Sequence, residues 1–199
     1  MDKKEQTIHT YNTTALALAE KFDNIGVRTD DIAETFALIE KENPFVLEIG
    51  CGNGRDAQEI LKYTHWYKGV DISEKLIEIA KQKVPNGIFE IADLETYVFP
   101  ECVDVVFAFA SLIHTPREIL KNMFTRLYAV MSERGLVRLS MKYADEYVEV
   151  TKTDEFGTRI YYLYSQTDIQ EIVTPFVVVK NSLNKSQGQI WVEMILRKE

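Results

Sequence analysis

The sequence predicts an α/β fold, with a mostly parallel seven-stranded sheet between two layers of helices. Three observations predict it. From about residue 40 onward, short apolar strand-like segments alternate with helix-like segments. A strand at residues 45–49 runs into three glycines at alternate positions and then into a helix. The last two strand-like segments are joined by a link that is too short for a crossover helix, so they must pair antiparallel.

Length, charge and cysteine content set the broad class. With 199 residues the chain is long enough to bury a substantial core, and we expect one domain over residues 1–199. A net charge of −8 argues against broad nucleic-acid binding, which depends on phosphate neutralisation. We see no secretory or membrane-spanning segment, and Cys51 and Cys102 form neither a disulfide framework nor a metal-ligand cluster. We therefore expect a cytoplasmic protein without membrane attachment or a bound metal.

The N-terminal region, residues 1–42, is predicted to be a helical lid. Residues 7–40 carry two apolar faces of helical spacing, separated by a break at residues 24–26. Asn43-Pro44 ends the helical region before the first strand. Helices are next expected from Arg55 to about Tyr63, and from an N-cap at Ser73 to about Val84.

The next strand is predicted to end at Gly69-Val70-Asp71, and further strands are predicted at residues 88–91 and 103–110. Thr115-Pro116-Arg117-Glu118 has capping-box spacing and a proline at the first helical position, so we expect a helix from there to near Gly135. The apolar face of this helix is expected to comprise Ile119, Leu120, Met123, Phe124, Leu127 and Met131.

The C-terminal third is predicted to hold a fifth strand at residues 135–141 and a hairpin insertion over the mouth of the site at residues 143–164. The insertion turns at residues 154–157 and precedes a helix near Gln166. The final strands are expected at residues 176–180 and 189–197.

The segment from Phe45 to Ala57 predicts a nucleotide-binding cradle, whose glycines leave room for a ligand to lie against the backbone. These glycines are Gly50, Gly52 and Gly54. A dinucleotide loop needs a small residue where Arg55 stands, and a P-loop needs a Gly-Lys-Ser/Thr that does not follow. Glu48, at the end of the strand, would repel a diphosphate but suits a ligand with a positive charge.

The complete pattern Glu48-x-Gly50-x-Gly52-x-Gly54 resembles motif I of the class I S-adenosylmethionine-dependent methyltransferases. The resemblance continues with Asp71 and Asp93, which end the next two predicted strands, and covers roughly residues 40–199. It implies a three-layer sandwich with strand order 3-2-1-4-5-7-6 and an antiparallel last strand. The cofactor that it implies is S-adenosylmethionine, with S-adenosylhomocysteine as the product.

The same resemblance implies roles for individual residues. Asp71 would accept hydrogen bonds from the two ribose hydroxyls, and Asp93 would bind the adenine amino group between Ile72 and Leu94. Arg55 would either pair with the cofactor carboxylate or form a surface ion pair. The expected cofactor-binding residues are Tyr11, Glu48, Gly50, Cys51, Gly52, Gly54, Arg55, Asp71, Ile72, Asp93, Leu94 and Phe109.

The methyl acceptor is expected beside the N-terminal lid and the insertion. His114 follows the fourth strand and is the candidate catalytic base, with a structural contact as the alternative. Alternation places Arg159 and Tyr161 on one face of the insertion and Tyr162 and Tyr164 on the other; these aromatics either line the pocket or form the insertion's own core. An arginine suits an anionic substrate, whereas tyrosines suit a cation or a ring. The expected substrate-binding residues are Tyr11, His114, Arg159, Tyr161 and Tyr162.

We expect methyl transfer to a small molecule by in-line displacement, in which the acceptor attacks the methyl carbon and S-adenosylhomocysteine leaves. The segment Phe109-Ala110-Ser111-Leu112 stands where enzymes that methylate planar amino groups carry an Asn-Pro-Pro-Tyr-like motif, which disfavours such acceptors. The alternatives are a protein or tRNA methyltransferase and a non-catalytic S-adenosylmethionine-binding regulator. The acceptor, the methylated atom and the oligomeric state, monomer or dimer, are left open.

Overall fold

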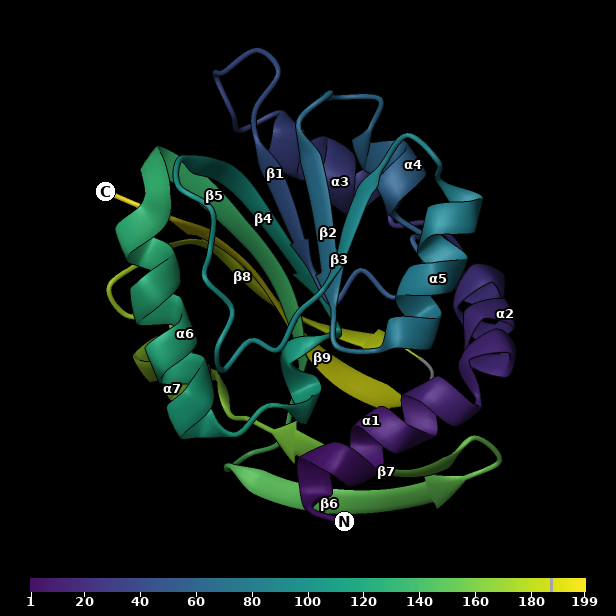
Figure 1. The fold of residues 1–199 in the computed structure, drawn as a ribbon. Helices are drawn as coiled ribbons and strands as arrows, with labels where there is room; N and C mark the ends of the chain where they lie inside the picture. Colours follow the sequence, from purple (N-terminus) through teal and green to yellow (C-terminus); the bar gives the residue numbers. More distant parts are fainter. Residues whose placement is uncertain (187) are drawn as a thin grey trace.

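The computed structural model describes residues 1–186 and 188–199, and its centre is a seven-stranded sheet in the order β3-β2-β1-β4-β5-β9-β8 (Figure 1). With β8 and β9 counted as the sixth and seventh strands, this is the predicted order, which is thereby confirmed. The sheet strands are β1 Val46–Ile49, β2 Tyr67–Asp71, β3 Ile88–Ile91, β4 Val103–Phe109, β5 Met131–Lys142, β8 Val177–Ser186 and β9 Gln189–Arg197.

The pairing directions follow the prediction as well. In the sheet, the neighbouring strands β3, β2, β1, β4 and β5 pair in parallel, whereas β9 pairs antiparallel with both β5 and β8. A separate antiparallel ribbon of β6 (Val148–Asp154) and β7 (Gly157–Leu163) is the predicted hairpin insertion.

Helices cover both faces of the sheet (Figure 1). The helices are α1 Lys3–Thr13, α2 Ala15–Ile25, α3 Thr29–Phe36, α4 Ala57–Ile60, α5 Glu74–Lys83, α6 Arg117–Val130 and α7 Gln166–Ile172. Leu120 and Phe124 of α6 and Ile169 of α7 pack in the core on one face, whereas Ile32 of α3 and Ile77 of α5 pack on the other. All seven residues of β4 are buried, as expected for the central strand of a parallel sheet covered on both sides.

The N-terminal region differs in detail from the prediction of a single helical span with one break. It forms three helices, with breaks at Thr14 and again after Gly26, whose φ of +88° suits glycine. Helix α1 begins earlier than expected because Asp2 caps it in a capping box with Glu5. It crosses in front of the β6–β7 ribbon (Figure 1).

Two helix predictions were wrong at their ends. The helix expected from Arg55 to Tyr63 is only the four residues of α4, and Thr64 beyond it donates a hydrogen bond to the carbonyl of Pro44, which holds the chain beside the start of β1. No capping box forms at Thr115, because Pro116 itself is the extended N-cap residue of α6.

The end of α6 was also predicted too late. The helix ends at Val130, and Met131 is extended because it pairs with Val103 at the start of β5. Met131 therefore belongs to the sheet rather than to the apolar face of the helix, and Gly135 lies inside β5.

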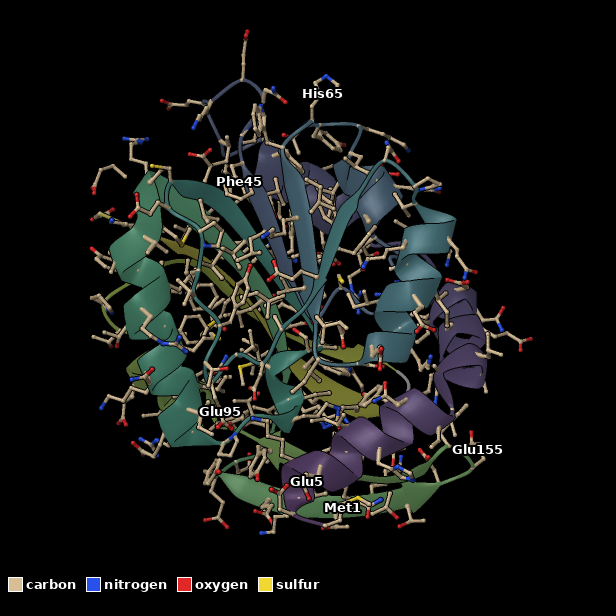
Figure 2. The ribbon with its side chains drawn as sticks, in the orientation of Figure 1. Met1, Glu5, Phe45, His65, Glu95 and Glu155 are labelled. Atoms are coloured by element: carbon tan, nitrogen blue, oxygen red, sulfur yellow. The ribbon has the colours of Figure 1, made fainter. Side chains whose placement is uncertain are left out.

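The strand ends fix where a site can form. Phe45 and His65, which precede β1 and β2, lie at the opposite end of the molecule from Glu5 of α1 and Glu155 of the ribbon turn (Figure 2). The carboxyl ends of the parallel strands therefore point toward α1 and the ribbon, where open α/β sheets bind ligands. Within the described part of the chain, no helix has the length and apolar character needed to cross a bilayer.

Candidate active site

A cavity of about 1070 Å³ lies at the carboxyl ends of the central strands, beneath α1 and the β6–β7 ribbon. Pockets for a single drug-sized ligand are usually about 300–1,000 Å³, so this one has room for a cofactor and a second molecule. The residues expected from the sequence that border it are Tyr11, Glu48, Gly50, Cys51, Gly52, Arg55, Asp71, Ile72, Asp93, Leu94, Phe109, His114, Arg159, Tyr161 and Tyr162.

The glycine loop shows why each glycine is present. A Cβ on Gly50 would lie 2.1 Å from that of Ser111, and a Cβ on Gly54 would lie 3.2 Å from that of Ala80 in α5. Gly54 therefore packs the loop against a helix, and it is the one expected site residue that does not border the cavity. A Cβ on Gly52 (φ +55°) would only touch the ring of Phe22, at 3.9 Å, and Gly52 borders the cavity, so a ligand can lie against its backbone.

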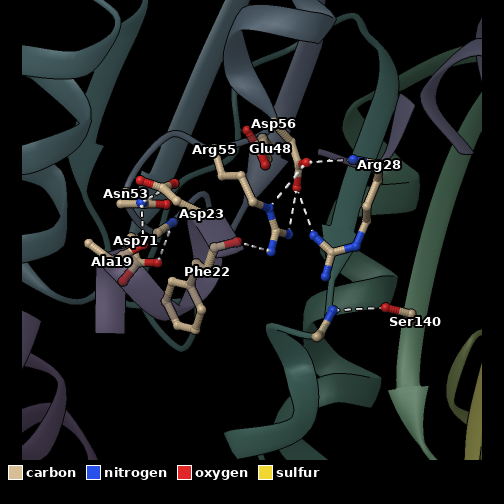
Figure 3. A network of polar contacts seen from close by, with 12 residues as sticks. Ala19, Phe22, Asp23, Arg28, Glu48, Asn53, Arg55, Asp56, Asp71 and Ser140 are labelled. Atoms are coloured by element: carbon tan, nitrogen blue, oxygen red, sulfur yellow. Dashed lines mark hydrogen bonds and ion pairs between the residues drawn. The ribbon is translucent and has the colours of Figure 1, made fainter. Parts of the chain in front are cut away.

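Ser111 supplies an unpaired polar atom beside this loop. The chain turns sharply after β4 at Ala110, whose φ is +53° and whose N–H donates to Ser140 Oγ at 2.9 Å (Figure 3). Among the described residues, Ser111 Oγ is buried and has no hydrogen-bond partner, although it borders the cavity. A buried hydroxyl without a partner suits a polar ligand group at this point.

The two strand-end acids lie on the cavity and already hold local contacts. Asp71 accepts hydrogen bonds from the backbone N–H groups of Gly52 (2.9 Å) and Ser73 (2.8 Å). Because a carboxylate has about four lone-pair positions, Asp71 keeps acceptor capacity for a ligand. Asp93 pairs with Lys4 Nζ at 2.6 Å, which ties α1 to the end of β3.

Glu48 is a buried carboxyl group that faces other acids. Tyr67 donates its hydroxyl hydrogen to Glu48, and Arg28 attracts the carboxylate. Burial, reinforced by the negative charge of Asp56, raises the pKa of Glu48 to about 8. Glu48 is therefore mostly protonated at neutral pH, and a cationic ligand would favour its ionised form.

Arg55 is held by protein groups (Figure 3). It pairs with buried Asp56 at 2.8 Å and donates to the carbonyl of Phe22 at 3.3 Å. Arg28, which the sequence analysis missed, pairs with the same carboxylate at 2.7 Å and lies 4.8 Å above the ring of Phe109. No motif marks Arg28, because it follows a helix break in the least patterned part of the chain.

Tyr11 and His114 meet at the other end of the cavity. Tyr11 Oη lies 2.9 Å from His114 Nε2, and His114 Nδ1 contacts the carbonyl oxygen of Ile160. A carbonyl only accepts, so Nδ1 carries the hydrogen and Nε2 accepts the hydrogen of Tyr11. Burial lowers the pKa of His114 to about 4, so its imidazole is neutral at physiological pH.

The ribbon presents its two faces as predicted. Arg159 and Tyr161 face Tyr11 and His114, with the Tyr161 ring centroid 4.6 Å from that of His114. Tyr164 is fully buried and donates to the carbonyl of Thr115, so it belongs to the core. Tyr162 stacks on Tyr147 and packs in the same core, although it also borders the cavity.

Lys142 is a further residue that the sequence analysis missed. It ends β5, and its Nζ lies 3.6 Å from the Tyr161 ring centroid. Its position at the carboxyl end of a parallel strand is the signal that would have identified it.

A family model matches the central part of the chain. Residues 46–135 match the family model described as a methyltransferase domain, which spans the glycine loop, both strand-end acids and α6. Over residues 46–135 the chain is therefore similar to methyltransferase domains, in agreement with the resemblance of its glycine loop. The match leaves out α1 to α3 and the β6–β7 ribbon, which cover the cavity.

Curated relatives resemble this chain over part of their length. It is 27% identical over 129 residues to trans-aconitate 2-methyltransferase of Escherichia coli, covering 62% of this chain and 49% of that protein. It is 30% identical over 130 residues to malonyl-(acyl-carrier protein) O-methyltransferase 1 of Ilyobacter polytropus, covering 61% and 48%. The chain thus spans about half the length of the curated relatives it matches.

A solved structure extends the fold comparison to the whole chain. Magnesium protoporphyrin IX methyltransferase from Synechocystis, solved with bound S-adenosylmethionine, superposes with a TM-score of 0.75. The alignment covers 100% of this chain and 98% of that one at 18% sequence identity, so the N-terminal helices and the ribbon lie within the shared fold.

Proposed function

We propose that this methyltransferase transfers the methyl group of S-adenosylmethionine to a small-molecule acceptor. The observation that carries the proposal is one continuous cavity that borders both the glycine loop with Asp71 and Asp93 and the Tyr11–His114 pair. Its volume exceeds what a single small ligand needs. Cofactor and acceptor can therefore meet inside one covered site.

The residues present fit the cofactor. Gly52 exposes its backbone to the cavity, and Asp71 keeps free acceptor positions for ribose hydroxyls. Asp93 can accept a hydrogen bond from the adenine amino group, either beside its ion pair with Lys4 or after Lys4 has moved away. Glu48 and Ser111 provide polar atoms for the amino-acid end, whose ammonium Glu48 would favour when ionised. When bound, S-adenosylmethionine supplies a methyl group already activated by the sulfonium.

The protein would then contribute alignment and exclusion of water. Tyr11 closes over the cavity from α1, and its hydroxyl is oriented by His114. If the acceptor must lose a proton, that proton would reach Nε2 of His114 through Tyr11 Oη, because the Tyr11 hydroxyl already donates to the lone pair of Nε2. For an acceptor that is already ionised, His114 acts as a positioning residue for Tyr11.

The covered cavity favours a small acceptor over a macromolecule. Helix α1 packs on the ribbon, where Thr10 Oγ1 donates to the carbonyl of Thr158 at 2.6 Å. Ile160 N donates to Thr7 Oγ1 at 3.1 Å and ties the next turn of α1 to the same strand. A protein or tRNA would have to open these contacts, whereas the trans-aconitate in the name of one relative is a small acid.

The proposal is tested with S-adenosylmethionine labelled in its methyl group. The protein is incubated with the label and with three fractions of a cell extract: molecules below about 1 kDa, protein and RNA. We expect label to enter only the small-molecule fraction, with Asp71→Asn as the control that loses it. Label in protein or RNA alone would support a macromolecular methyltransferase. Cofactor binding without any transfer would support a non-catalytic regulator.

A further inference from the structure

The acceptor end of the cavity is rich in cations. Four cationic side chains from four elements border it: Lys21 of α2, Lys142 of β5, Lys152 of β6 and Arg159 of β7. Two acids accompany them, and both have partners. Asp154 pairs with Arg159, and Glu193 accepts from Asn184 at 2.6 Å and lies 3.6 Å from Arg138.

Lys142 stands out among these cations. Within residues 1–186 and 188–199, no carboxylate forms an ion pair with it and no acceptor bonds its ammonium. Instead the ammonium lies over the rings of Tyr161, at 3.6 Å, and Trp191, at 6.0 Å. Burial and the neighbouring charges of Lys152, Arg159 and Lys21 lower its pKa to about 8, only partly offset by Asp154. A bound anion would relieve this repulsion.

Arg159 carries a second unsatisfied donor at the same place. Its side chain is only 6% exposed, and one of its terminal nitrogens pairs with Asp154. Among the described residues, its Nε is buried without a hydrogen-bond partner. Buried donors of this kind are rare without a ligand or water, and an arginine donor edge matches a planar carboxylate.

The Tyr11–His114 pair points to the same acceptor chemistry. Nε2 of His114 is occupied by the Tyr11 hydroxyl, so this imidazole does not face the acceptor directly as a base. Carboxylate oxygens are ionised at neutral pH and need no base, whereas alcohols and ammonium groups must first lose a proton. The rings of Tyr161 and Trp191 beside Lys142 favour a flat anionic group over a tetrahedral one.

We propose that the acceptor is a small carboxylate anchored by the ammonium of Lys142 and by Arg159. The assignment of this anion as the methyl acceptor rests on the proposed function, whereas its binding at Lys142 does not. Lys142 is then the residue that determines specificity for an acidic acceptor.

The test is calorimetric titration of the full chain, with and without saturating S-adenosylhomocysteine. The probes are trans-aconitate, citrate and benzoate, with benzamide as the neutral analogue of benzoate and phenyl phosphate as the other anion. The variants are Lys142→Met, which keeps the length of the side chain, and Lys142→Arg, which keeps the charge. Lys121→Met, on the exposed side of α6, is the control for loss of one positive charge.

We expect at least one carboxylate to bind the wild type more tightly than benzamide does. Lys142→Met should weaken this binding about 10- to 100-fold, the range for a hydrogen bond to a charged group, while Lys142→Arg and Lys121→Met stay close to wild type. Affinity for S-adenosylhomocysteine should be the same in every variant, which also shows that the variants are folded.

Four results would overturn the proposal: no binding of any carboxylate, equal binding of benzamide, binding of phenyl phosphate alone, or full carboxylate affinity in Lys142→Met. Any of these, with S-adenosylhomocysteine still bound, leaves the proposed function standing. Carboxylate binding that depends on Lys142, in a protein that does not bind S-adenosylhomocysteine, supports the anion site and refutes the proposed function.

Discussion

Replacing Glu48 by glutamine should stabilise the protein at neutral and alkaline pH while weakening cofactor binding. Glu48 is buried beside Asp56 and Asp71, and its pKa is raised from 4.5 to about 8. The folded state therefore holds a proton on Glu48 up to about pH 8, whereas the unfolded chain releases it near pH 4.5. The favourable contribution is complete below pH 4.5 and is lost progressively as the pH rises toward 8.

The size of the effect follows from this shift. Each pH unit between 4.5 and the working pH costs about 1.4 kcal/mol, so the wild type loses about 3 kcal/mol by pH 7 from this one group. Glutamine mimics the protonated carboxyl and keeps an oxygen to accept from Tyr67. We expect Glu48→Gln to match the wild type near pH 4.5 and to exceed it by about 3 kcal/mol at pH 7.

The assay is urea unfolding at pH 5 and pH 7.5, for the wild type and for Glu48→Gln. Glu90→Gln is the matched control, because Glu90 forms only an exposed ion pair with Lys68 and should contribute at most about 1 kcal/mol. A stability difference between Glu48→Gln and the wild type that is the same at both pH values would show that Glu48 is ionised throughout. That result would refute the reasoning.

Three further predictions concern the same cavity. Gly52 and Gly26 both have a positive φ that alanine disfavours, so Gly52→Ala and Gly26→Ala should each lose about 1–2 kcal/mol of unfolding free energy in urea. Only Gly52→Ala should also weaken S-adenosylmethionine binding, because only Gly52 borders the cavity, and equal affinities would contradict a ligand lying against Gly52. Asp71→Asn should raise the calorimetric dissociation constant for S-adenosylmethionine about 10- to 100-fold, and an unchanged constant would remove Asp71 from the site. The pKa of His114 is lowered from 6.5 to about 4, so between these pH values the unfolded chain binds a proton on His114 and the folded protein does not. The unfolding free energy should therefore fall by up to about 3 kcal/mol between pH 6.5 and 4, and His114→Gln should flatten this decline.

The sheet was predictable because its signals are local. Ser73 caps α5 as expected, by accepting from Leu76 N, and the turn at residues 154–157 closes the ribbon. The errors arose where a distant partner decides the local conformation. Met131 continues an apolar helical face in the sequence, yet pairing with Val103 makes it the first residue of β5. The hydrogen bond from Thr64 to the carbonyl of Pro44, beyond the short α4, is likewise a distant contact that no local pattern reveals.

The site was predictable where chemistry and backbone geometry coincide in one motif. Glu48, Gly52 and Asp71 belong to such segments, and all three border the cavity. Arg28 and Lys142 were missed because their roles come from tertiary neighbours: Asp56 for the first, and a cluster of cations for the second. The partners of Arg55 could not be known either, since Phe22 lies on another helix.

The most direct test of the account is calorimetric titration of the purified protein with S-adenosylmethionine and S-adenosylhomocysteine, with NADH as the control. The glycine loop, Asp71 and Asp93 predict binding of both adenosyl ligands with dissociation constants on the order of micromolar, and no binding of NADH. Absence of binding for both adenosyl ligands, or binding of NADH alone, would contradict the assignment of this cavity to S-adenosylmethionine.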